Sequence, residues 1–172
     1  YEIALDELRK AQILGGGNSE NIIQVLTMRA DVYYRMKDYN NAFETFEEAL
    51  SKDNEDLTIL NNYAYYLAEQ NMKLKEAEIM SRKVIEKEKD NPTFLDTYAW
   101  VLYKRGKTKD AAKIMESIIR NGSNLHAEYY EHYGFILKSR KKCDKAIENW
   151  RIAFKLDSTK TELEGEINSC KR

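Results

Sequence analysis

The chain has 172 residues, a formal net charge of −1, 42% apolar residues and a single proline. This length suits one sizeable domain, and the scarcity of proline and glycine favours a helical globular chain over a disordered one. The near-neutral charge gives no basis for strong attraction to nucleic acid or to an acidic membrane surface. The longest apolar stretches, at 63–68 and 98–103, have six residues each, which is too short to cross a bilayer.

The first predicted helix covers residues 1–14, because Ala4, Leu8 and Ala11 fall on one helical stripe. Later helices repeat this spacing, so we expect 1–14 to be the second helix of a truncated repeat. A run of three glycines at 15–17 follows. Such a run can cradle a phosphate, but this one lacks the preceding strand and the following Lys-Ser/Thr of that motif. A helix stop and a loop are therefore favoured.

Four copies of one skeleton come next, each with two predicted helices and a tight turn between them. A small residue lies in the middle of each first helix, and an alanine followed by larger side chains occupies each second helix. The recurring positions are Ala30, Ala42, Phe46 and Ala49; Ala64, Ala77, Ser81 and Val84; Ala99, Ala111, Met115 and Ile118; and Gly134, Ala146, Trp150 and Ala153. Copies begin 34, 35 and 35 residues apart. A fixed period of this length indicates a stacked helical array in which small residues allow close helix packing.

The expected helices after the first run over 21–36, 39–51, 56–70, 74–87, 92–105, 107–121, 127–139, 143–156 and 161–170. The sequence is divided into full repeats at 23–56, 57–91, 92–126 and 127–160, and the polar segment 161–172 is expected to cover the last apolar face. Pro92 suits the first turn of a helix, where its missing amide donor is not needed.

This pattern resembles the tetratricopeptide repeat over essentially the whole chain. The proline that usually closes a repeat is absent, and Asn54, Lys89, Ser123 and Ser158 occupy those places. The resemblance implies an all-α fold, a right-handed superhelical array of antiparallel helix pairs (an α-solenoid) whose first helices line the concave side. It also implies a non-catalytic scaffold for protein–protein interaction, without a cofactor.

Each first helix keeps a second stripe once its packing residues are subtracted. Aromatic side chains flanked by amides and carboxylates suit an extended peptide or a partner helix. The predicted groove residues are Asp31, Tyr34, Asn62, Tyr65, Glu69, Asp96, Trp100, Tyr103, Lys104, Glu131, His132 and Phe135. We expect Trp100 on the surface, although some of these aromatics could instead pack between copies. The excess of carboxylates favours a partly basic protein or peptide ligand.

Some members of the family clamp a C-terminal carboxylate with Lys, Arg and Asn from three successive repeats. Asn62 matches one of those places, but Thr27, Thr93 and Thr97 occupy the basic ones. The resemblance therefore does not imply a carboxylate clamp here.

The sequence shows no catalytic or metal-binding pattern. His126 and His132 lie six residues apart, on different faces of a helix, so a shared metal is not predicted. No nucleophile–base set is evident, and the chain is not expected to be an enzyme. Cys143 and Cys170 are interpreted as two free thiols, with a structural disulfide as the alternative. Arg29 replaces a tyrosine of the other copies, and we expect it to reach the carboxylate of Asp6 or Glu7.

A second interpretation of the function stays open. The chain begins without Met, so we expect it to be part of a longer protein, in the cytoplasm or the periplasm. It could be an accessory helical domain of a larger enzyme or of an envelope-assembly protein. Such a domain would dock against its own chain, or dimerise through the N-terminal end that no helix covers.

Overall fold

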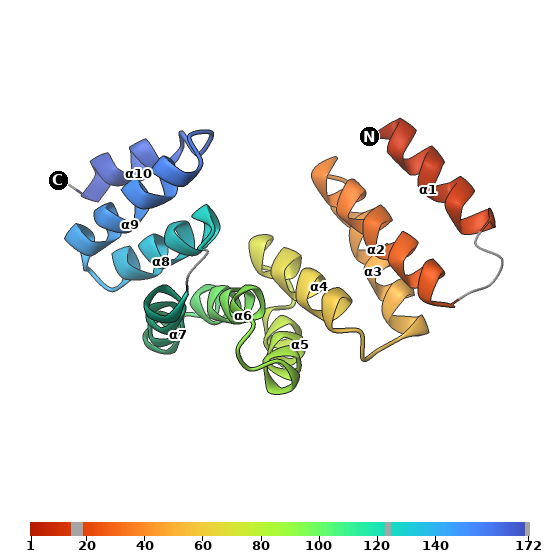
Figure 1. Cartoon of the computed structure of the whole chain (residues 1–172), viewed down its shortest axis with the longest axis horizontal. Helices are drawn as coiled ribbons and strands as arrows, with labels where there is room; N and C mark the ends of the chain where they lie inside the picture. Colours follow the sequence, from red (N-terminus) through yellow and green to blue (C-terminus); the bar gives the residue numbers. More distant parts are fainter. Residues whose placement is uncertain (15–18, 123–124, 171–172) are drawn as a thin grey trace. The chain divides into compact units, whose positions relative to one another are not determined.

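The computed structural model describes residues 1–14, 19–122 and 125–170, which form ten α-helices and no strand (Figure 1). The helices are α1 (Glu2–Leu14), α2 (Ser19–Arg35), α3 (Tyr39–Lys52), α4 (Leu57–Glu69), α5 (Leu74–Lys87), α6 (Pro92–Lys104), α7 (Thr108–Asn121), α8 (Ala127–Ser139), α9 (Cys143–Leu156) and α10 (Leu163–Cys170). The all-α prediction is confirmed, and every predicted helix is found with its ends within two residues of the expected ones. The glycine run at 15–17 lies outside the described residues.

The helices belong to two compact units, residues 1–66 and 67–172, and the residues of α4 are divided between them. In the first unit, α1 packs on α2 and α2 packs on α3. In the second unit, neighbours in sequence from α5 to α10 are also neighbours in space (Figure 1). Sequential packing of this kind lets each helix pair cover the apolar face of the next.

The recurring small residues lie in the core, as the spacing predicts. Ala30, Ala42, Ala99 and Ala146 are completely buried. A methyl side chain keeps the two axes of a helix pair close, and the remaining space is filled by larger buried residues. These include Phe46, Met115 and Trp150.

Each turn within a helix pair places a residue in the left-handed region at the same point of the repeat. These residues are Lys37, Asn71, Gly106 and Lys141, with φ values of 62°, 53°, 79° and 60°. Their positions in the chain repeat the 34, 35 and 35 residue spacing of the sequence. A left-handed residue after a helix bends the chain back while satisfying the last carbonyl groups, so the same turn is built four times.

Two helices begin directly after a residue whose side chain caps the helix. The Asp38 carboxylate accepts a hydrogen bond from the amide of Asn41 at the start of α3 (3.3 Å). The Asn91 side chain accepts from the amide of Thr93 at the start of α6 (3.1 Å), directly before Pro92. Both are N-caps, which satisfy amide groups that have no partner inside the helix.

Aromatic contacts join α4 to the two helices before it. Tyr63 stacks on Phe46 with ring centroids 5.4 Å apart, and Tyr66 stacks on Tyr34 at 3.8 Å. The Tyr63 hydroxyl donates a hydrogen bond to Glu47 (2.9 Å), so the polar end of this buried ring is satisfied.

The expectation of two free thiols is wrong. Cys143, at the start of α9, and Cys170, at the end of α10, form a disulfide with their Cα atoms 5.4 Å apart. Helix α10 packs back along α9 because Leu163 enters a core cluster that contains Leu137 and Trp150. This docking brings the two cysteines together although 27 residues separate them.

The expected partners of Arg29 are also wrong. Its guanidinium donates to the side-chain oxygens of Gln12 (3.1 Å) and Glu48 (2.9 Å). Asp6 and Glu7 instead form ion pairs with Lys10, on their own helix. A carboxylate of α3 therefore neutralises Arg29, and α1 supplies only an amide.

Candidate functional site

Trp100 does not lie on the surface, and that expectation is wrong. Its side chain is only 6% exposed. The imidazole of His132, from α8, stacks on the indole with centroids 4.1 Å apart. The indole N–H donates to Oε1 of Glu69, at the end of α4, over 2.7 Å. The stack covers the apolar face of the indole, and the hydrogen bond satisfies its N–H group, so Trp100 is accommodated inside the second unit.

Asp96 and His132, two further predicted groove residues, form a buried pair. His132 Nδ1 lies 2.9 Å from Oδ2 of Asp96. Burial by itself lowers the pKa of His132, but Asp96, with smaller contributions from Glu131 and Glu69, outweighs burial and raises it. The pair is therefore an internal charge contact between α6 and α8, out of reach of a ligand.

The other predicted groove residues of the second unit are half-buried, and most of them contact a charged or aromatic side chain of the protein. Lys104 Nζ lies 4.8 Å from the Trp100 ring centroid and 3.7 Å from Oε1 of Glu69. Glu131 forms an ion pair with Lys160. Tyr103 and Phe135 lie beside Trp100, at centroid distances of 4.9 and 6.1 Å. The charges of this stripe are largely compensated within the protein.

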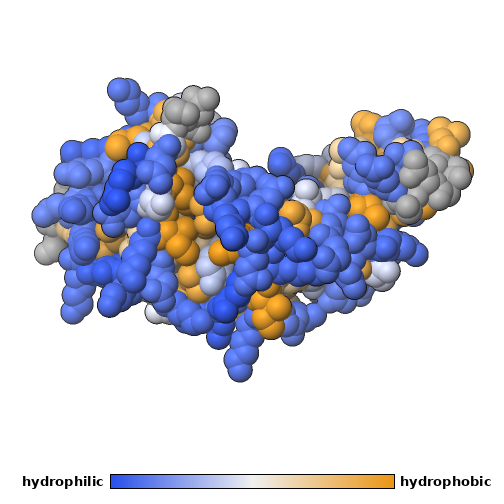
Figure 2. All heavy atoms as spheres, turned by 60° about the horizontal axis from the view of Figure 1, so that its bottom comes forward, coloured by the Kyte–Doolittle hydropathy of each residue, from blue (hydrophilic) through white to orange (hydrophobic). Residues whose placement is uncertain are grey.

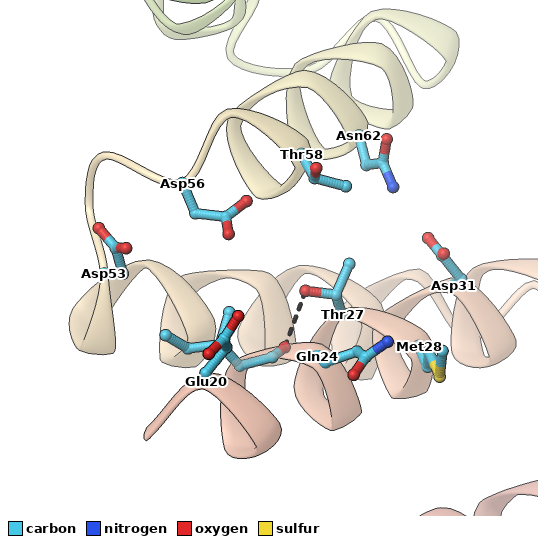
Figure 3. A pocket seen from close by; sticks show the side chains of 10 residues that line it. Glu20, Gln24, Thr27, Met28, Asp31, Asp53, Asp56, Thr58 and Asn62 are labelled. Atoms are coloured by element: carbon cyan, nitrogen blue, oxygen red, sulfur yellow. Dashed lines mark hydrogen bonds between the residues drawn. The ribbon is translucent and has the colours of Figure 1, made fainter. Parts of the chain in front are cut away.

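In the first unit, the structure brings predicted residues around an open cavity of about 720 Å³. It lies between α2 and the segment that leads from α3 into α4 (Figure 3). We call it the α2–α4 pocket, and its lining is Glu20, Ile23, Gln24, Thr27, Met28, Asp31, Asp53, Asp56, Thr58 and Asn62. Four of these side chains carry a carboxylate, and none of the described lining residues is basic.

The carboxylates of the pocket differ in how well they are satisfied. Asp56 accepts a hydrogen bond from the amide of Ile59 (2.9 Å), and Asp53 accepts from the amide of Glu55 (2.8 Å). Both thus act as local caps in the segment between α3 and α4. By contrast, Oδ1 of Asp31 is buried and accepts no hydrogen bond.

Asp31 is the carboxylate with unused bonding capacity. Figure 3 shows Asp31 and Asn62 extending into the space between α2 and α4. Burial raises the pKa of Asp31, and a hydrogen bond with Tyr66 and the charge of Arg35 oppose this only in part. A cation entering the pocket would therefore stabilise the ionised form of Asp31.

Sequence reasoning missed some of the lining residues. Asp31 and Asn62 were predicted, but Glu20, Met28, Asp53 and Asp56 were not. The missed aspartates stand in the segment between two helices, where they serve as caps, and the helical spacing used for the stripe does not extend into that segment. An N-cap pattern before α4 is the signal that could have indicated Asp56.

Neither a metal centre nor a membrane span was found in the parts that the structure describes. Within residues 1–14, 19–122 and 125–170, no three side chains of His, Cys, Asp or Glu form a group suited to a metal ion. No helix of the same ranges combines the length and the apolar character that crossing a membrane requires.

The fold and the pocket define a class: an all-α protein of helix pairs that pack in sequence order, with an open polar pocket between first helices. Within it, residues 24–53 match the tetratricopeptide repeat family. No curated protein matches the chain in sequence.

Solved structures show the same fold. The chain is similar to TTC0263, a thermophilic tetratricopeptide repeat protein in Thermus thermophilus, with a TM-score of 0.68 and 12% identity over 97% of this chain and 98% of that one. A tetratricopeptide repeat protein from Parabacteroides merdae matches with a TM-score of 0.57 and 14% identity over 99% of this chain and 78% of that one. MamA from Desulfovibrio magneticus matches with a TM-score of 0.62 and 13% identity, covering 92% and 97%. The resemblance is supported in two ways: residues 24–53 match the tetratricopeptide repeat family, and the chain shares the fold of solved tetratricopeptide repeat proteins.

Proposed function

We propose that this chain is a non-catalytic interaction scaffold that binds a peptide or partner helix carrying a basic side chain in the α2–α4 pocket. The observation that carries this proposal is the Asp31 carboxylate, whose buried Oδ1 accepts no hydrogen bond. A Lys or Arg side chain of the ligand would bring the opposite charge to this half-buried carboxylate, which lines the pocket. The fold, shared with other tetratricopeptide repeat proteins, supports an interaction scaffold as the class of function.

The shape and charge of the pocket support the same ligand. Glu20, Asp53 and Asp56 add negative charge around Asp31, and they would attract a cationic group as it approaches. Gln24, Thr27, Thr58 and Asn62 offer neutral hydrogen-bonding groups for the ligand backbone.

The half-buried stripe of the second unit is proposed as a separate contact surface for a partner. Tyr103 and Phe135 provide partly accessible aromatic surface for apolar side chains. In this proposal Asp96, Trp100 and His132 position the stripe from beneath and do not touch the ligand. Tyr34 and Tyr65 have the corresponding half-buried positions in the first unit.

The test uses a peptide that contains Lys or Arg and is selected from a peptide array by its binding to the chain. Isothermal titration calorimetry then compares this peptide with a version in which Gln replaces the basic residue. We expect Asp31→Asn to weaken binding of the basic peptide about tenfold, a loss on the order of 1.4 kcal/mol. The same variant should keep or raise the thermal stability, because it removes a poorly satisfied buried charge. Asp90→Asn, at an exposed aspartate of the second unit, is the matched control. Equal affinity of wild type and Asp31→Asn would refute the proposal.

A specific observation favours self-association as a second candidate function. Helix α1 buries none of its residues completely, and Ile3, Ile13 and Leu14 are all strongly exposed. Such residues on a terminal helix would be covered in a dimer or by another part of a longer chain. Sedimentation velocity should then show a dimer that Ile3→Lys with Leu14→Lys converts to a monomer, whereas a monomeric wild type would exclude dimerisation.

A further inference from the structure

The exposed face of α5 combines an apolar residue with a ring of positive charge. Ile79 is 69% exposed. Lys75, Arg82 and Lys83 lie four residues before it and three and four residues after it, so they surround Ile79 on the same helical face. A cavity of about 430 Å³ lies here, and Arg105, from the end of α6, also lines it.

Beneath this face, one carboxylate holds three cations. Glu78 is buried and forms ion pairs with Arg82, Arg105 and Lys107. A single carboxylate neutralises one of the three charges, so two remain in excess at short range. The side chains of Arg82 and Lys107 are 52% and 41% exposed, which leaves donor groups within reach of a ligand.

The positive charge continues onto α7. An adjoining cavity of about 300 Å³ shares Arg82 and is also lined by Lys107 and Lys113. Together the two cavities are lined by six basic and three acidic residues, although the whole chain has a net charge of −1. Figure 2 shows, on the face it draws, a mainly hydrophilic surface in which apolar atoms form small separate patches. A local excess of one charge around an apolar centre is the arrangement of an interface with a charged rim.

We propose that this α5 basic surface docks an acidic peptide segment of a protein partner. By α5 basic surface we mean Lys75, Ile79, Arg82, Lys83, Arg105 and Lys107. An aliphatic side chain of the segment packs on Ile79, and the carboxylates on either side pair with the surrounding cations. The surface is separate from the α2–α4 pocket in residues and opposite in charge, so the inference does not depend on the function proposed above.

The chemistry of the surface favours a peptide over other anions. A nucleic-acid backbone presents no aliphatic group that would pack on the exposed Ile79. Glu86 and Asp110, which also line the two cavities, would repel a continuous polyanion or an anionic membrane. A short segment with an aliphatic residue between spaced carboxylates avoids both conflicts.

The test is fluorescence anisotropy of the whole chain with a library of labelled peptides that carry acidic, variable, aliphatic, variable and acidic residues in that order. We expect a subset to bind at concentrations below about 1 mM and to lose affinity as salt is raised. Ile79→Ser should weaken these peptides about tenfold or more, because the aliphatic contact is lost. The paired substitution Arg82→Glu with Lys83→Glu should abolish binding.

Matched controls keep the outcome specific. Ile152→Ser replaces another exposed isoleucine, on α9, and Lys109→Glu reverses another exposed charge, on α7 outside both cavities. Both should leave affinity unchanged, and circular dichroism should show that all variants are folded. The proposal is overturned if no library peptide binds, if Ile79→Ser binds as tightly as wild type, or if anionic vesicles, RNA or a second copy of the chain occupies the surface instead.

Discussion

Gly134 of α8 lies directly against the indole ring of Trp150 of α9. A β-carbon added at Gly134 would lie 2.3 Å from the indole nitrogen, whose hydrogen donates to the carbonyl oxygen of Glu131 over 3.2 Å. Trp150 is completely buried and cannot move aside without disturbing the core. Glycine is thus needed at this position for close approach.

The first prediction concerns this contact. Gly134→Ala would gain about 1 kcal/mol from helix propensity but lose about 1–3 kcal/mol or more from overpacking, so we expect net destabilisation. Gly165→Ala, in α10, is the control, because a β-carbon there has no neighbour within 4 Å. Urea unfolding should show opposite signs for the two variants. Stabilisation by both would contradict the contact.

The second prediction concerns the buried carboxylate of Glu78. Glu78→Gln replaces this carboxylate with a neutral amide and leaves Arg82, Arg105 and Lys107 without their shared anionic partner. We expect a loss of about 1–3 kcal/mol, below the value for fully buried pairs, because the cations are partly exposed.

The acid dependence of this loss has a definite sign. Burial alone raises the pKa of Glu78, but Lys107, Arg105 and Arg82 together hold it below 4.5. The stabilisation is then present above pH 4.5 and is lost as pH falls through the pKa in the folded state. Unfolding curves of wild type and Glu78→Gln should converge on acidification. A constant difference from about pH 7 to about pH 3 would refute the ionic role.

The third prediction concerns the buried pair of His132 and Asp96. Because the pKa of His132 is raised on folding, its contribution is complete below pH 6.5 and is lost as pH rises through the higher value in the folded state. Wild-type stability should therefore fall over that range relative to His132→Gln. His126→Gln, at the exposed histidine, should keep the wild-type dependence. An imidazole titration by NMR at or below the ordinary pKa would disprove this assignment.

The fourth prediction concerns the disulfide that ties α10 to α9. Closing 27 residues of chain stabilises the folded state by about 2–4 kcal/mol in the chain-entropy account. Reduction, or Cys143→Ser with Cys170→Ser, should lower stability by that order and accelerate hydrogen exchange in α10. Reductant should have no effect on the double variant. Unchanged exchange in α10 after reduction would show that Leu163 and its neighbours hold the helix without the bond.

The candidate site was only partly predictable from the sequence. Helical spacing identified Asp31 and Asn62 as members of a stripe outside the core, and both line the α2–α4 pocket. The same spacing placed Trp100 and His132 on a groove, whereas they stack on each other inside the second unit. A stripe left over after one packing face is removed can still contact the next helix pair, and spacing along one helix carries no information about that neighbour.

The sequence by itself determined the repeat, the number and ends of the helices and the burial of the recurring alanines, because these depend on contacts between residues a few turns apart. Only the tertiary structure decided which charges meet. Arg29 pairs with Glu48, Glu78 meets Arg105 and Lys107, and Cys170 reaches Cys143. Each of these partnerships joins different helices or the turns that follow them. Long side chains on neighbouring helices have several opposite charges within reach, and the packing of the helices selects among them.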